Sequence, residues 1–158
     1  MPNYSAHFSL GLSRIVSTSS LISQFLEVCP EFKPRWEEHL ANWGDEPAGD
    51  YNDMREFAAF IVDCHGREET SFLPGIFSLI ESIFESGNAE EKKIITVGLL
   101  ESIQIQSTHF EFGPDAFVPY LGPHSRAAWA SIARAWEGKD TLMDVLRAET
   151  EQHESPET

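Results

Sequence analysis

Apolar residues recur every three or four positions in one segment after another, and this spacing limits the chain to helical folds. The clearest case is 71–86, where Leu73, Ile76, Phe77 and Ile80 line one face of the predicted helix. Proline and glycine separate such segments, because proline suits a first helical turn and glycine suits the position after the last one. The pattern predicts helices over about 20–29, 34–43, 51–65, 71–86, 89–106, 123–137 and 140–146, with an ambiguous stretch at 8–16 that also favours helix.

The segment 89–106 is predicted to be the central helix of the fold. Its apolar residues, from Ile94 to Ile105, point to every side, which is typical of a helix without a solvent-facing side. Glu101 falls among them and is expected to be partly buried, with a hydrogen-bonding or cationic partner, because an unpaired buried carboxylate is costly. The predicted fold is all-α, with antiparallel helix pairs packed as a bundle or a short solenoid-like stack around this helix.

The chain is expected to form a single helical domain over residues 1–148. The last stretch, 149–158, is polar, which is typical of a disordered tail. Cys29 and Cys64 lie among apolar residues, so both are expected to be buried thiols. No apolar run reaches the roughly 20 residues that a membrane helix needs, and no signal peptide is visible. A cytoplasmic protein that does not bind membranes is therefore expected.

The net charge of −15 indicates what kind of partner the chain can have. Acidic residues number 26 and basic residues 11. A surface of this sign repels nucleic acid and anionic lipid, and it speeds encounter with a basic partner. High solubility is the simpler interpretation of the same charge, so the charge alone does not identify a function. It does argue against nucleic-acid binding.

No pattern of catalytic or metal-binding residues is found, so no enzyme, cofactor or metal is expected. The six histidines form none of the spacings that hold a metal ion. His124 and Ser125 are neighbours, but adjacent residues of a helix point about 100° apart and cannot pair as base and nucleophile. Phosphate-binding glycine loops are also missing.

A set of short motifs, in this order, resembles a family of small, acidic, helical bacterial proteins of unassigned molecular function. Members of that family are similar to the immunity proteins encoded beside polymorphic and contact-dependent toxins. The motifs cover about residues 20–138. They are Cys-Pro-Glu-Phe at 29–32, Trp36-x-x-x-Leu40, Gly-Asp-Tyr-x-Asp at 49–53, Glu-Glu-Lys-Lys-x-Ile at 90–95, and Tyr-Leu-Gly-Pro-x-Ser-Arg-x-x-Trp at 120–129.

The resemblance implies an immunity protein that binds a cognate toxin domain, often a basic one, and covers its active site or substrate groove. It supplies no catalytic residues, and it suggests that Arg126 pairs with an acidic side chain such as Glu101. The partner-binding candidates are acidic residues near predicted loops. They are Glu37, Glu38, Asp45, Glu46, Asp50, Asp53, Glu111 and Asp115.

Two other functions stay open. A helical adaptor or regulatory scaffold would present an exposed, concave apolar groove to a protein or peptide. An enzyme or small-molecule binder without a recognisable motif would hold Glu101, His109 or His124 in a deep pocket with a shifted pKa.

Overall fold

The structure of the chain is a computed structural model, which describes residues 20–137. Every regular element in this range is a helix, and no strand occurs in it. The predicted all-α fold is therefore confirmed. The elements are α2 (Ser20–Val28), η1 (Pro30–Phe32), α3 (Lys33–Trp43), α4 (Asp50–Gly66), α5 (Leu73–Ser86), α6 (Ala89–Lys93), η2 (Ile94–Leu100), α7 (Glu101–Ser107), η3 (Pro114–Tyr120) and a last helix over 123–137.

Some predictions fall outside this range. They are the possible helix at 8–16, the glycine stop at 138, the helix at 140–146 and the polar tail at 149–158.

Local signals account for most of the helix ends. Pro34 and Pro74 lie in the first turns of α3 and α5, where a missing N–H costs nothing. Gly44 follows α3 with a φ of 66°, a left-handed conformation that favours glycine. Asn88 and Glu91 exchange side-chain and backbone hydrogen bonds at the start of α6 and form a capping box.

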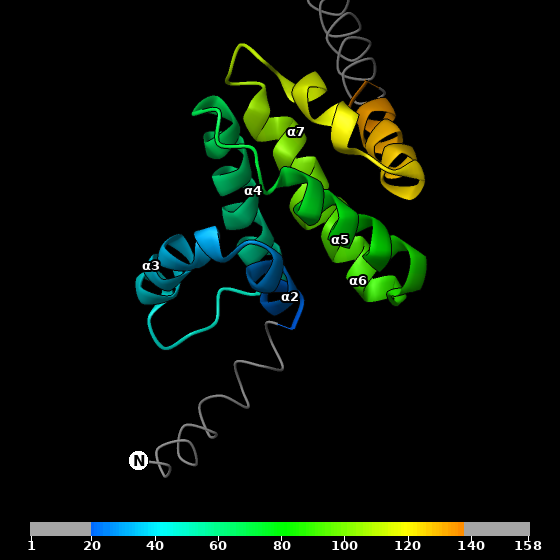
Figure 1. The fold of residues 1–158 in the computed structure, drawn as a ribbon. Helices are drawn as coiled ribbons and strands as arrows, with labels where there is room; N and C mark the ends of the chain where they lie inside the picture. The colour runs from blue at the N-terminus through cyan, green and yellow to red at the C-terminus, as the bar shows by residue number, and fades with distance from the viewer. Residues whose placement is uncertain (1–19, 138–158) are drawn as a thin grey trace, which may run out of the picture.

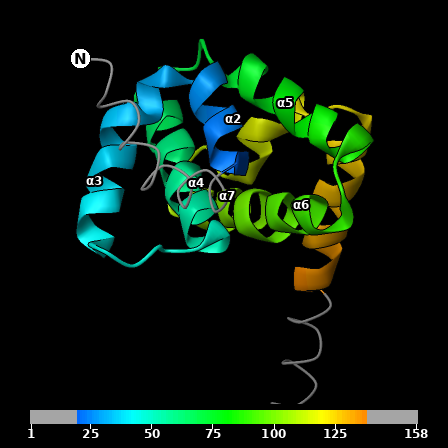
Figure 2. The same ribbon diagram turned by 90° about the horizontal axis from the view of Figure 1, so that it is seen from below.

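Two elements form the centre of the fold: α4 and the continuous helix formed by α6, η2 and α7, which pack against each other (Figure 1). On another side α3 packs against α4, and α2 bridges α4 and α5 (Figure 2). Aromatic side chains fill the interior between these helices. The centroid of the Phe32 ring lies 4.8 Å from the ring centroid of Phe57 and 5.1 Å from that of Phe60. Cys29 and Cys64 are both buried free thiols, as expected.

The helix over 89–107 is the central, largely buried element that the pattern predicts, but the expectation that every side is buried is wrong. Val97 and Ile105 are 44% and 43% exposed. Val97, the half-buried Glu101 and Ile105 recur every four residues, so they form one solvent-facing stripe of the helix. Gly98 lies against α4, where a Cβ atom would lie only 3.1 Å from that of Met54.

Within residues 20–137, no helix combines the length and the apolar character needed to cross a membrane.

Candidate functional site

The acidic residues predicted on α3 and in the loop after it form an exposed surface. Glu37 and Glu38 lie on α3, and Asp45 and Glu46 follow in the loop; all four are exposed. Asp50 begins α4 and is half-buried. Burial, and then repulsion by Glu90 of α6, raise the pKa of Asp50 above its ordinary value. Negative charge is therefore crowded at this end of α4.

Asp53 does not belong to that surface, which corrects the prediction. It is only 6% exposed, and its Oδ1 atom lies 2.9 Å from Nε2 of His39, which is buried as well. Burial raises the pKa of Asp53, and the hydrogen bond with His39 acts in the opposite direction. The reason for its burial is its position on the side of α4 that α3 covers. Asp53 ties the two helices together.

The last two predicted residues, Glu111 and Asp115, are exposed but lie at the opposite end of α4. Their neighbours Phe110 and Phe112 pack against Gly66, the last residue of that helix. At 1.5 Å per residue, the 17 residues of α4 separate the two groups by about 25 Å. The structure thus brings together the acids of α3 and its loop, and it leaves Glu111 and Asp115 apart from them.

The segment that carries this surface has few cations of its own. Residues 20–50 contain seven acidic and two basic residues. One of the two, Arg35, points to α4, where it contacts Glu56 at 2.6 Å and Asp63 at 2.9 Å. Only Lys33 remains for the exposed carboxylates, and within the described part of the chain it forms no ion pair.

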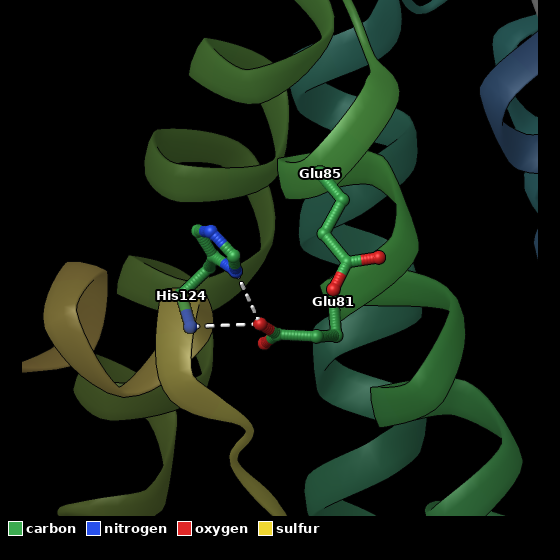
Figure 3. A group of neighbouring side chains, drawn as sticks. All are labelled: Glu81, Glu85 and His124. Atoms are coloured by element: carbon green, nitrogen blue, oxygen red, sulfur yellow. Dashed lines mark hydrogen bonds and ion pairs between the residues drawn. The ribbon is translucent and has the colours of Figure 1, made fainter.

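A second cluster was not foreseen from the sequence. Glu81 of α5 reaches the start of the 123–137 helix (Figure 3). Its Oε2 accepts a hydrogen bond from the backbone N–H of His124 at 2.7 Å and lies 2.6 Å from the Nδ1 atom of the same residue. Its Oε1 accepts from the N–H and the hydroxyl of Ser125, each at 3.0 Å. One carboxylate thus collects four donors at a helix N-terminus.

Electrostatics make Glu81 a helix cap and a poor base. Burial by itself raises the pKa of this carboxyl, but the backbone and side-chain hydrogen bonds from Ser125 and His124 outweigh it and lower the pKa to about 2. A carboxylate with such a pKa takes up protons poorly near pH 7. Gly122, at the start of the helix, has no side chain that could cap it. The carboxylate of Glu81 lies where a side chain of residue 122 would begin, since a Cβ atom on Gly122 would be 2.6 Å from Oε1 of Glu81.

The same cluster includes the donor atoms that a divalent cation would need. Ligand atoms of Glu81, Glu85 and His124 all lie within 4.8 Å of one another, and Glu85 follows one turn after Glu81 (Figure 3). Both oxygens of Glu81 already accept hydrogen bonds, so a cation bound between Glu81 and Nδ1 of His124 would have to replace the hydrogen bond that joins them. Helix capping accounts for this arrangement without a metal.

The suggested pairing of Arg126 with Glu101 is wrong. Arg126 donates from Nη2 to the carbonyl of Leu121 at 3.2 Å. Glu101 is half-buried, as expected, but it has no hydrogen-bonding or cationic partner among residues 20–137. Its partial contact with solvent removes the need for one.

Sequence patterns offer only a weak signal for the Glu81 cluster. The Gly-Pro-x-Ser motif at 122–125 predicts the start of a helix whose N-cap residue, Gly122, has no side chain to accept a hydrogen bond. Nothing in it indicates that the missing acceptor comes from Glu81, 43 positions earlier.

The comparisons with known proteins agree with the extent of the motifs described above. Residues 22–137 match a family described as a domain of unknown function, DUF7674. No curated protein and no solved structure matches this chain at significant similarity. Because the match spans well over half of the chain, the protein belongs to the DUF7674 family.

Proposed function

We propose that this protein neutralises a cognate bacterial toxin by binding it and covering its active site or substrate groove. The interface is the acidic surface of α3 and its following loop, which comprises Glu37, Glu38, Asp45, Glu46 and Asp50. In this proposal the partner presents a basic surface, as a nuclease or another enzyme that acts on nucleic acid does.

One observation carries the proposal: the exposed carboxylates lie on α3 and in the loop after it, and Arg35 pairs with α4, which leaves Lys33 as the one Lys or Arg of residues 20–50 without an ion pair in the described part of the chain. Beside them, the half-buried Asp50 has its pKa raised, first by burial and then by repulsion from Glu90 of α6. A basic partner relieves this repulsion on binding, and the field of such a surface speeds association.

A helical adaptor is the second candidate, and a different observation favours it. An open groove of about 540 Å³ lies along α2 and α3 and has apolar residues in its lining. Such grooves receive protein segments of many kinds. The two candidates differ in one consequence: only the first predicts that binding protects a cell from a toxic protein.

The experiment is a growth assay in which this protein is co-expressed with the toxic domain encoded beside its gene. Protection is expected, and the reversal of Glu37, Glu38, Asp45 and Glu46 to Lys should abolish it while the circular dichroism spectrum stays unchanged. Asp53 is left out of this variant, because a lysine there would be buried against His39. The matched control is Glu85→Lys, an exposed charge reversal on α5.

Association with the purified toxin domain should slow as the salt concentration rises, since salt screens exposed charges. If the neighbouring protein is not toxic, or if growth is not restored, toxin neutralisation is refuted and the adaptor candidate is favoured.

A further inference from the structure

A continuous strip of side chains follows α2, η1 and α3 and forms the groove mentioned above. The lining residues recur every three or four positions, so they occupy successive turns of one surface. They are Ser23, Leu26, Glu27, Pro30, Lys33, Trp36, Glu37 and Leu40. The two helices meet at η1 (Figure 1), and Pro30 of η1 lines the groove between their contributions.

The groove combines apolar contact area with unpaired negative charge. Its apolar side chains come from both helices, and Leu40 is 40% exposed. Trp43, also exposed, lies one turn after Leu40 on α3 and extends the apolar surface on that face of the helix. Single exposed apolar residues are ordinary, but two large ones on one face beside an apolar groove form a patch.

The charges beside these apolar residues indicate what can dock there. Glu27 and Glu37 line the groove, are exposed, and form no ion pair within residues 20–137; Lys33 also lines it, so acidic side chains outnumber basic ones by two to one. Glu38 lies next to them on α3 and is exposed as well. An acidic segment would be repelled, and a purely apolar one would leave these carboxylates without counterions.

We infer that the groove binds a basic amphipathic segment of the partner protein, whose large apolar side chains contact Leu26, Trp36 and Leu40 while its Lys or Arg residues pair with Glu27 and Glu37. This inference deepens the proposed function, on which it rests, because it names the part of the partner that the acidic surface receives. In helix-in-groove recognition the apolar face of an amphipathic helix supplies the anchors, and charged residues at the edge of the groove favour a partner of opposite charge.

The test measures peptide binding to the full chain by fluorescence anisotropy. The first probe is a 14-residue helical peptide with Leu on one face and Lys on the other. The second keeps the Leu positions and replaces every Lys by Glu, and the third keeps Lys and replaces every Leu by Ser. The first peptide is expected to bind at least tenfold more tightly than either of the others, because only it meets both requirements of the groove.

Two pairs of variants place the binding in this groove. Leu40→Ala should weaken the first peptide about tenfold, which is the loss of about 1.4 kcal/mol, whereas Ile105→Ala, an equally exposed aliphatic position on α7, should leave it unchanged. Glu37→Lys should weaken it about threefold or more at low salt, whereas Glu85→Lys should not. All four positions are exposed, so the variants should fold as the parent does.

Three results would overturn the inference. The first is equal binding of the Lys and Glu peptides; the second is unchanged binding by Leu40→Ala. The third is a lower mass for the Leu40→Ala variant than for the parent in analytical ultracentrifugation, since the groove would then be a contact between copies of this chain. Toxin protection is measured separately: if it persists while no peptide binds, the proposed function stands and the groove inference is wrong. If peptides bind but protection fails, the groove serves an adaptor.

Discussion

Replacing Glu81 by Gln should remove a charge-assisted helix cap while keeping the shape of the side chain. The carboxylate accepts hydrogen bonds from the backbone N–H groups of His124 and Ser125, at 2.7 Å and 3.0 Å. The amide of Gln brings an N–H₂ group toward those donors and loses the negative charge that a helix N-terminus favours. The free energy of unfolding should therefore fall.

The lowered pKa of Glu81 sets the magnitude of this loss. A shift from the ordinary value of 4.5 to about 2 corresponds to roughly 3 kcal/mol, at about 1.4 kcal/mol per pKa unit. The carboxylate is 15% exposed and beside solvent, so screening reduces the expected loss to about 2 kcal/mol at pH 7. For a chain of this size that is a decrease in Tm of about 4–8 °C.

The pH dependence provides the sharper test. Because folding lowers this pKa, the stabilisation by Glu81 is complete above about pH 4.5 and is lost as the pH falls toward 2. Urea denaturation at pH 7, 5 and 3, followed by circular dichroism, should show the gap between wild type and Glu81→Gln closing as the pH falls.

Glu85→Gln is the matched control, because Glu85 lies one turn further along α5, is exposed, and caps no helix. Its effect should stay within about 0.5 kcal/mol. A gap for Glu81→Gln that is equally large at pH 3 and pH 7, or no larger than that of the control, would refute the capping argument.

Three further changes test the packing around these sites by thermal or urea denaturation. Gly122→Ala should destabilise the protein by about 1–2 kcal/mol, because its Cβ displaces the Glu81 carboxylate, and its combination with Glu81→Gln should cost less than the sum of the two; full additivity would contradict this. Asp53→Ala should cost about 1–3 kcal/mol by leaving His39 buried without its partner, while Glu46→Ala changes little; equal effects would show that Asp53 is not structural. His65→Phe should preserve or raise Tm, because Nδ1 of His65 is buried without a hydrogen bond to any residue of 20–137 and its ring packs against other rings; a clear decrease in Tm would contradict this.

The helices themselves could be predicted because the signals that specify them are local. The Leu73–Phe84 stripe, the capping box at Asn88 and the glycine at position 44 each act within about one helical turn. The predicted helix limits in residues 20–137 accordingly lie within a few residues of those observed.

The side of a helix that faces solvent was harder to predict. The apolar residues of 89–106 suggested burial on every side, yet Val97 and Ile105 are exposed. Which face of this helix is covered depends on where α4 packs, as at Gly98 against Met54, and that contact is a property of two helices together.

The candidate site divides in the same way. The acidic, cation-poor character of residues 20–50 follows from the sequence alone, since it requires only a count of charges. The sequence alone does not show which of the predicted acidic residues face solvent. Asp53 is buried because α3 places His39 over it, and His39 is 14 positions away along the chain.

The sequence by itself determined the all-α class, most helix ends, the buried thiols and the excess of negative charge, because these depend on periodicity and composition. Only the tertiary structure decided that Glu81 caps a helix that begins 42 residues later, that Glu111 lies far from Asp45, and that α2 and α3 share an apolar groove. These features arise where separate helices meet, and a pattern that repeats every 3.6 residues specifies which face of a helix is apolar but not which helix will cover it.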